Sequence, residues 1–266
     1  MAHQNPTIPA SFSRVVIECV SPNVNSGRFP LKRIVGGTVP VCARVFADGH
    51  DHIDACVLYR VRGDQKWQEA ILTPGHNDLW QGEFPVTTIG TYEYTVEGWI
   101  DHFGTWHADT EKKIRANLDI GVELQVGYHM VMEASKRAPH NDAHQLESLA
   151  NRLRAQEDWE TLGRDLKAFM RKYPDRSLAA RYSPLLLVNV ERKRACFSAW
   201  YEFFPRSCPR AGDGSHGSFV DCEKVLPRIA QMGFDIVYLP PIHPIGTTAR
   251  KGKNNATSAT PADPGS

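Results

Sequence analysis

Apolar side chains recur at every second position along several short segments in the first hundred residues. They do so from Val39 to Val45, and Tyr92, Tyr94 and Val96 alternate with polar neighbours. Successive side chains of a β-strand point to opposite faces of the sheet, so this period predicts strands with one buried face. Turn residues separate the segments, which is the spacing of an all-β sandwich. The strands are predicted at 15–20, 39–46, 55–61, 80–84 and 91–100.

Around Asn117 the spacing of apolar residues lengthens from two to three or four, which is typical of amphipathic helices. Each helix of this kind buries one stripe of side chains. We expect the stripes to pack on one another, and two alternatives stay open: packing on the sandwich, or packing on another subunit. The predicted stripes are Leu118, Val122, Val126 and Met130, then Leu146, Leu149 and Leu153, then Trp159, Leu162, Leu166, Phe169 and Tyr173.

Beyond Pro184 the pattern indicates a strand, a helix and a second strand. The strands are predicted at 195–204 and 234–239, the helix at 219–232, and Gly233 should end that helix. A right-handed crossover makes two such strands parallel, and parallel sheets need further strands and cover on both faces. This region therefore reads as the beginning of a larger α/β domain.

The fold class that we predict is multi-domain, with separate α and β regions. Residues 1–13 are expected to be a disordered N-terminus. Residues 14–115 should form an immunoglobulin-like β-sandwich, residues 116–180 a helical segment, and residues 184–266 the start of a β/α domain.

Charge and composition exclude several classes of function. The 31 basic and 30 acidic residues give a net charge of +1, which indicates neither a nucleic-acid nor a membrane partner. No apolar run reaches the length of a signal peptide or a membrane span, so we expect a cytoplasmic protein. The six cysteines form no CxxC pair and should be reduced. His50 and His52 lack metal-ligand spacing, and we expect no metal and no cofactor.

The chemistry is expected in the loop that follows the second predicted strand of the β/α region. Arg250, Lys251 and Lys253 alternate there with a glycine and two asparagines, an arrangement that offers an anion positive charge and hydrogen-bond donors. A solvated basic loop is the alternative. His243 lies just past the strand and is a candidate sugar contact, although packing among prolines would equally explain it.

Four tryptophans in the first region have two interpretations. Their rings would stack on sugars as a binding platform, or they would pack in the core and at sheet edges. We expect packing, because aromatic residues supply most of the burial in a small sandwich. The four are Trp67, Trp80, Trp99 and Trp106.

Five motifs follow one another in the second half of the chain: SAWYEFFPRS at 198–207, HG at 216–217, MGFD at 232–235, YLPPIHPIG at 238–246 and KGKNN at 251–255. Together they resemble one enzyme family, the alpha-1,4-glucan:maltose-1-phosphate maltosyltransferases of the α-amylase superfamily (glycoside hydrolase family 13). The resemblance extends over nearly the whole chain.

The resemblance implies that residues 184–266 hold the first βαβ unit of an incomplete TIM barrel. It also implies a retaining transfer of maltosyl units from maltose 1-phosphate to the non-reducing ends of α-1,4-glucans, with release of phosphate. In the family the sandwich and the helical segment help to build a homodimer. A lysine of the KGKNN motif meets the donor phosphate, for which we choose Lys253, then Lys251, with Asn254 beside them.

The aspartate nucleophile and glutamate acid/base of the family's retaining mechanism lie on later strands, so no catalytic residue is carried over to this sequence. Two hypotheses follow. The chain is the amino-terminal portion of a maltosyltransferase and is inactive alone. Alternatively, it is a non-catalytic module for dimerisation or α-glucan binding.

Overall fold

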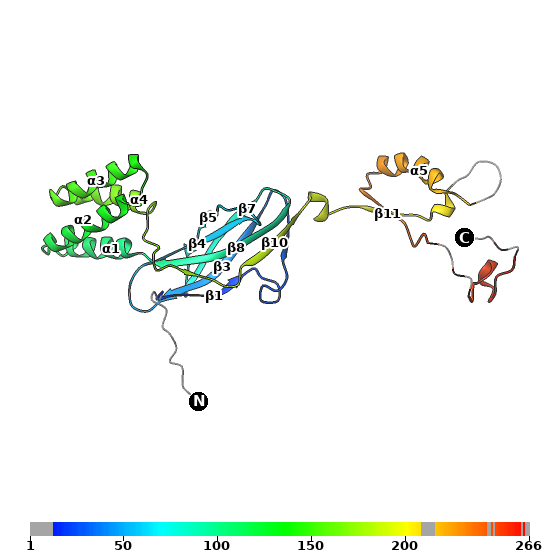
Figure 1. The fold of residues 1–266 in the computed structure, drawn as a ribbon, viewed down its shortest axis with the longest axis horizontal. Coiled ribbons are helices and arrows are strands. Elements are labelled where there is room, and N and C mark those ends of the chain that lie inside the picture. The colour runs from blue at the N-terminus through cyan, green and yellow to red at the C-terminus, as the bar shows by residue number, and fades with distance from the viewer. Residues whose placement is uncertain (1–12, 209–215, 244–245, 247, 262, 264–266) are drawn as a thin grey trace, which may run out of the picture. The chain divides into compact units, whose positions relative to one another are not determined.

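The computed structural model describes residues 13–208, 216–243, 246, 248–261 and 263. The chain divides into two compact units, Met1–Arg192 and Lys193–Ser266, which we call the first and second unit (Figure 1). The prediction of disorder for 1–13 falls almost wholly on residues outside the described ones. Among the described residues, none of the helices combines the length and apolar character that a bilayer span requires.

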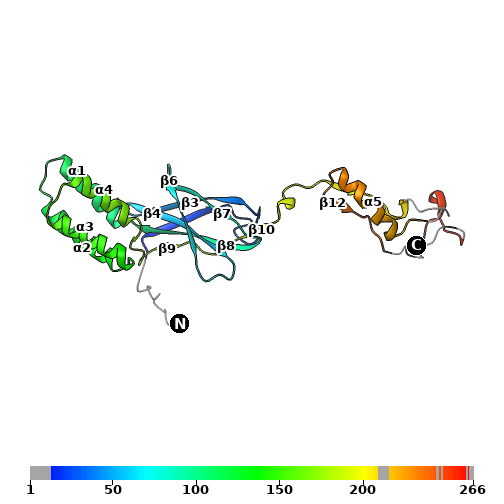
Figure 2. The same cartoon turned by 90° about the horizontal axis from the view of Figure 1, so that it is seen from above.

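The first unit contains two sheets that share one core (Figures 1 and 2). The chain also contains helices, so it is a mixed α and β protein. The four-stranded sheet has the order β1 (Val15–Ser21), β3 (Gly37–Ala47), β7 (Leu79–Val86) and β6 (Thr73–Pro74). The six-stranded sheet has the order β2 (Leu31–Ile34), β10 (Leu186–Glu191), β8 (Gly90–Ile100), β4 (Ile53–Val61) and β5 (Gln68–Ile71), with β9 (Ala180–Arg181) paired to β8.

The period-two pattern of the sequence is confirmed in the core between these sheets. From Val39 to Val45 of β3, every second side chain is buried, and Tyr94 of β8 lies opposite them against Phe84 of β7. Burying one such side chain stabilises the fold by roughly 1.5–3 kcal/mol. The alternating apolar side chains on which the strand predictions were based are therefore the ones that pack in the core between the sheets.

Strand β10 was not predicted, because the sequence analysis assigned residues beyond 184 to the β/α region. It pairs antiparallel with β8 and parallel with β2, in the middle of the six-stranded sheet. Asn189 of β10 accepts a hydrogen bond from Thr91, which lies 98 positions earlier in the chain. A strand whose partners are this distant in sequence carries no local signal of where it pairs.

Four helices lie in the chain between β8 and β9 and pack on one another (Figure 2). The first of them, α1, was not predicted, because its buried face includes the polar residues His107 and Thr110 beside Trp106. The helices are α1 (His102–Arg115), α2 (Gly121–Ser135), α3 (His140–Arg154) and α4 (Trp159–Met170).

The stripe predicted on α2 is only partly buried in the helical core. Met130 packs against that core, whereas Val122 and Val126 are 68% and 42% exposed. Gly127 lies on the buried face instead, where a Cβ would lie 2.1 Å from the ring of Trp106. The glycine lets the Trp106 ring approach the α2 backbone, so the buried face of α2 is centred away from Val122 and Val126.

The second unit has the predicted order of strand, helix and strand. Its strands, β11 (Trp200–Glu202) and β12 (Ile236–Tyr238), pair in parallel, as expected. Helix α5 (Phe219–Gln231) connects them and begins with a capping box between Ser218 and Asp221. Gly233, at φ +86°, follows the end of the helix, which confirms the predicted stop.

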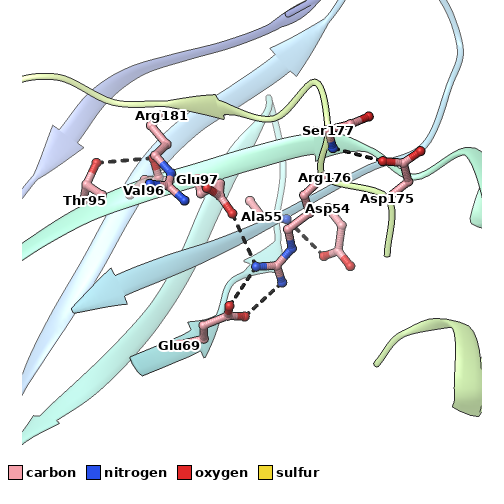
Figure 3. Close-up of polar contacts among 10 residues, drawn as sticks. All are labelled: Asp54, Ala55, Glu69, Thr95, Val96, Glu97, Asp175, Arg176, Ser177 and Arg181. Atoms are coloured by element: carbon pink, nitrogen blue, oxygen red, sulfur yellow. Dashed lines mark hydrogen bonds and ion pairs between the residues drawn. The ribbon is translucent and has the colours of Figure 1, made fainter. Parts of the chain in front are cut away.

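One ion-pair cluster ties the return from α4 to the six-stranded sheet (Figure 3). Arg176 donates two hydrogen bonds to Glu69, of 2.8 and 2.9 Å, and lies 3.3 Å from Glu97. Its guanidinium also lies over the ring of Trp99, 4.0 Å from the centroid. Burial opposes the charge, yet the bonds and charges of its carboxylate partners raise the pKa of Arg176. The cluster thus pairs the buried Glu97 side chain with two arginines and stabilises the charged guanidinium of Arg176.

We predict that Arg176→Met lowers the free energy of unfolding of the first unit by about 3 kcal/mol, because it leaves the buried Glu97 carboxylate with one partner fewer. Adding Glu97→Gln should recover part of the loss. Urea denaturation followed by tryptophan fluorescence measures both effects.

Arg152→Met is the matched control for this substitution. It breaks contacts with two half-exposed carboxylates, Glu157 and Asp165, and should cost less than about 1 kcal/mol. Equal losses for the two arginine variants would show that the Arg176 cluster contributes no more than a surface ion pair.

Candidate functional site

The candidate site residues follow the second of two parallel strands in the second unit. Because β11 and β12 are parallel, the segments that follow them leave from the same edge of the sheet. At the opposite edge, Asp235 fixes the start of the strand pair. Its carboxylate accepts a hydrogen bond from the backbone N–H of Ala199 at 3.1 Å and lies 3.4 Å from Arg194. The aspartate of the MGFD motif therefore has a structural role.

The KGKNN loop, residues 251–255, is shaped by its backbone. A Cβ on Gly252 would lie 2.6 Å from the carbonyl oxygen of Ser258, so the close approach at this point requires glycine. Ala259 donates a backbone hydrogen bond of 2.8 Å to Arg250, which closes the loop. Asn254 and Asn255 both have positive φ, a conformation that asparagine tolerates well.

Asp263 anchors this loop and was not predicted. Its carboxylate accepts hydrogen bonds from the backbone N–H groups of Lys253 (2.9 Å) and Thr260 (2.6 Å), and from the Thr260 hydroxyl. These bonds stabilise the ionised form and hold the pKa of Asp263 below its usual range. The spacing of Thr260 and Asp263, which is that of a capping pair, is a sequence signal that could have identified the anchor.

The two lysines of the loop differ in their surroundings. Lys251 donates a hydrogen bond of 2.9 Å from Nζ to Oδ1 of Asn255. Lys253 is exposed, and its Nζ has no hydrogen bond or ion pair within the part of the chain that the structure describes. Asn254 is exposed beside it on the same short 3-10 turn, Lys253–Asn255. The Lys253 ammonium and the Asn254 amide can thus donate to an anion.

His243, the candidate sugar contact, lies exposed in the segment after β12. Between described residues, no hydrogen bond or ion pair joins it to Lys251 or Lys253. Contacts within the KGKNN loop therefore join Lys251 to Asn255, whereas no such contact joins the loop to His243 among the described residues. The next two residues of its motif, 244–245, lie outside the described ones.

Three of the four tryptophans considered as a sugar platform are buried: Trp80 is 6% exposed, Trp99 2% and Trp106 8%. Trp67 is half-buried, with the guanidinium of Arg60 4.1 Å from its ring centroid. The expectation that these rings pack rather than form an open platform is confirmed for the three buried ones. The first unit offers no row of exposed indoles among its described residues.

Comparison with known proteins identifies relatives along nearly the whole chain. Residues 13–192 match the family model described as alpha-1,4-glucan:maltose-1-phosphate maltosyltransferase, domain N/S. A maltosyltransferase of that name from Chlorobaculum tepidum is 46% identical over 257 residues, and one from Methylacidiphilum infernorum is 43% identical over 259 residues. Another, from Myxococcus xanthus, is 46% identical over 264 residues.

These relatives are longer than the chain. Each alignment covers 95% of this chain but only 38% of the first two relatives and 40% of the third. The chain therefore spans about two fifths of the length of the curated relatives it matches.

We predict that the amide chemical shifts of Lys253 and Thr260 titrate together below the ordinary aspartate pKa of about 3.9. The folded loop lowers the pKa of Asp263. The contribution of Asp263 to the stability of the loop is therefore complete above the ordinary aspartate pKa and is lost as the pH falls through the lowered pKa. NMR spectra recorded between pH 5 and pH 2, as a practical range of roughly three units, measure the shifts.

Asp263→Asn is the control, since it removes the titrating group while keeping an oxygen acceptor. The titration of both amides should disappear in this variant. Amide shifts that still titrate together without the carboxylate would show that Asp263 is not the anchor.

Proposed function

We propose that this chain, which belongs to the alpha-1,4-glucan:maltose-1-phosphate maltosyltransferase family, forms the amino-terminal part of such an enzyme. The complete enzyme would transfer maltosyl units from maltose 1-phosphate to the non-reducing ends of α-1,4-glucans and release phosphate. The observation that carries the proposal is the match itself, which covers 95% of this chain at 46% identity.

The architecture that we propose has three parts. The two sheets that share a core form an immunoglobulin-like sandwich, and α1 to α4 form an insert, because the chain leaves that sheet at β8 and returns to it at β9. The unit β11–α5–β12 starts a TIM barrel. The predicted ranges were 14–115 for the sandwich, 116–180 for the helical segment and 184–266 for the barrel. We move the start of the barrel from residue 184 to Lys193, after β10.

Exposed apolar side chains on the second unit support the barrel. Two parallel strands and one helix leave apolar faces uncovered, and parallel sheets are stable only when both faces are packed. Further strands and helices of a barrel would cover them. The side chains concerned are Phe197, Trp200, Phe204, Phe219, Val220, Leu226, Met232, Tyr238 and Ile242, of which Phe197 is the most exposed at 80%.

We assign the donor phosphate to Lys253, with Asn254 beside it and Lys251 as the second choice. A phosphate binds best to charged donors that are not already engaged. Among the described residues, the Nζ of Lys253 has no partner and satisfies this condition, whereas Lys251 is bonded to Asn255. His243 stays a proposed sugar contact that a complete barrel would have to bring to the donor. No residue of the chain is assigned as a catalytic carboxylate.

We predict that maltose 1-phosphate shifts the amide signals of residues 251–255 in the 266-residue chain without any release of phosphate, even when glycogen is added. The loop can meet the phosphate group, but the reaction needs two carboxylates that we find no residues to supply. NMR titration measures binding, and a phosphate assay measures turnover. Robust phosphate release would contradict the proposal that the chain is inactive alone.

Lys253→Ala and Lys251→Ala form a matched pair for the same titration. Loss of one charge-assisted hydrogen bond should weaken donor binding about tenfold in Lys253→Ala. Binding by Lys251→Ala should change less. The opposite order would assign the phosphate to Lys251. If the unmodified chain itself shows no shift, the loop does not bind the donor, and family membership is unaffected.

A homodimer is the second part of the proposal, and one observation favours it. Leu118, Val122 and Val126 form an exposed apolar stripe on and just before α2, at 58%, 68% and 42% exposure. Contiguous apolar surface on a protein of this kind is typical of an interface. Of the packing alternatives left open for this stripe, packing on another subunit is the one its exposure favours.

We predict that the chain is a dimer in light scattering and that Val122→Asp makes it a monomer, because a carboxylate buried in an apolar interface would lose its hydration. Ile89→Asp is the control: Ile89 is 59% exposed in the same unit but lies outside the stripe. A monomeric parent chain, or dissociation of both variants, would contradict this interface.

A further inference from the structure

The second unit brings two thiols into contact. Cys208 follows the short 3-10 helix η2 (Pro205–Ser207), and Cys222 lies in the first turn of α5. Their Sγ atoms lie 3.4 Å apart, although the residues are 14 positions apart in sequence, and both side chains are buried. Among the six cysteines, all of which lie in the described part of the chain, this is the pair whose sulfur atoms touch.

The backbone around both thiols is fixed by several contacts. Gly217 donates a hydrogen bond of 3.1 Å to the carbonyl oxygen of Arg206, and a Cβ on Gly217 would lie 2.7 Å from the carbonyl oxygen of Cys208. The chain therefore returns tightly onto the segment that carries Cys208. One residue later, the Ser218–Asp221 capping box fixes the first turn of α5. Both sulfur atoms thus sit on anchored backbone.

We propose that Cys208 and Cys222 are a redox site. They form a reversible disulfide with each other by exchange with low-molecular-weight disulfides, which act as the oxidant. The chain would exchange two thiols for one S–S bond, and the oxidant would be reduced to two thiols. The bond would link the connection after β11 to the start of α5. This inference does not depend on the proposed function.

The exchange balances in two steps. One of the two protein sulfurs attacks one sulfur of the oxidant, breaks its S–S bond, forms a mixed disulfide and releases one thiol. The other protein sulfur then attacks the first, forms the internal disulfide and releases the second thiol. The two protons of the protein thiols leave on the two released thiols, so the chain loses two electrons and the oxidant gains two.

Each of the two S–H groups has an acceptor beside it. Cys208 donates to the Sγ of Cys222, and the Cys222 Sγ lies 3.9 Å from the carbonyl oxygen of Pro205, which can accept its S–H. Burial, and then the contact with Cys208, raise the pKa of Cys222 to about 11. Exchange by the Cys222 sulfur should therefore speed up as the pH rises towards that value.

The test treats the 266-residue chain with oxidised glutathione, blocks remaining thiols with iodoacetamide in denaturant, and measures the intact mass. We expect four blocked cysteines in place of six, a peptide linking Cys208 to Cys222, and recovery of all six after reduction with dithiothreitol. The linked form should also unfold at higher urea concentration, since a crosslink restricts the unfolded chain.

Two single variants test the pair. Cys222→Ser and Cys208→Ser should each lose the linked peptide, because each keeps only one of the two sulfurs. A double variant that replaces the exposed Cys19 and Cys196 by serine should still form the link. Six blocked cysteines after oxidation, or glutathione found only on the exposed cysteines, would overturn the site.

Discussion

The first unit depends on a charge interaction at the place where the chain returns to its own sheet. After leaving β8 and forming four helices, the backbone must rejoin the six-stranded sheet so that β9 and β10 can pair. Arg176 lies just before that junction and holds Glu69, Glu97 and the ring of Trp99 together. Glu97 is 4% exposed, so removing it from water is tolerable only because two arginines neutralise it.

This constraint also explains which parts of the fold the sequence predicted. Alternating residues such as Val39 and Val41 report burial directly, and the strands that contain them were predicted correctly. Strand β10 was assigned to the wrong region, because its place between β2 and β8 is set by pairing with distant strands and by the return that Arg176 anchors. Hydrophobic period indicates that a segment is buried, but it does not indicate which partner buries it.

The helices show the same limit in another form. A stripe of apolar residues every fourth position correctly predicted the α2 helix but only part of its buried face. Gly127, which has no side chain, decided the face by admitting the Trp106 ring. In α3, which begins at His140, the carboxylate of Asp142 accepts a hydrogen bond from the Tyr173 hydroxyl and does not cap the helix. Contacts between elements override local signals in both cases.

At the candidate site, side-chain chemistry was predictable and backbone shape was not. The lysines and asparagines of the KGKNN loop are visible in the sequence, whereas the anchor Asp263 acts through backbone N–H groups. Backbone shape also matters at two glycines of the second unit. Gly217 and Gly252 each sit where a Cβ would lie 2.6 Å from a carbonyl oxygen, so both loops are closed by a backbone approach that glycine alone permits. Preformed loops of this kind hold the Lys253 ammonium outward and the Cys208 sulfur inward before any ligand or oxidant arrives.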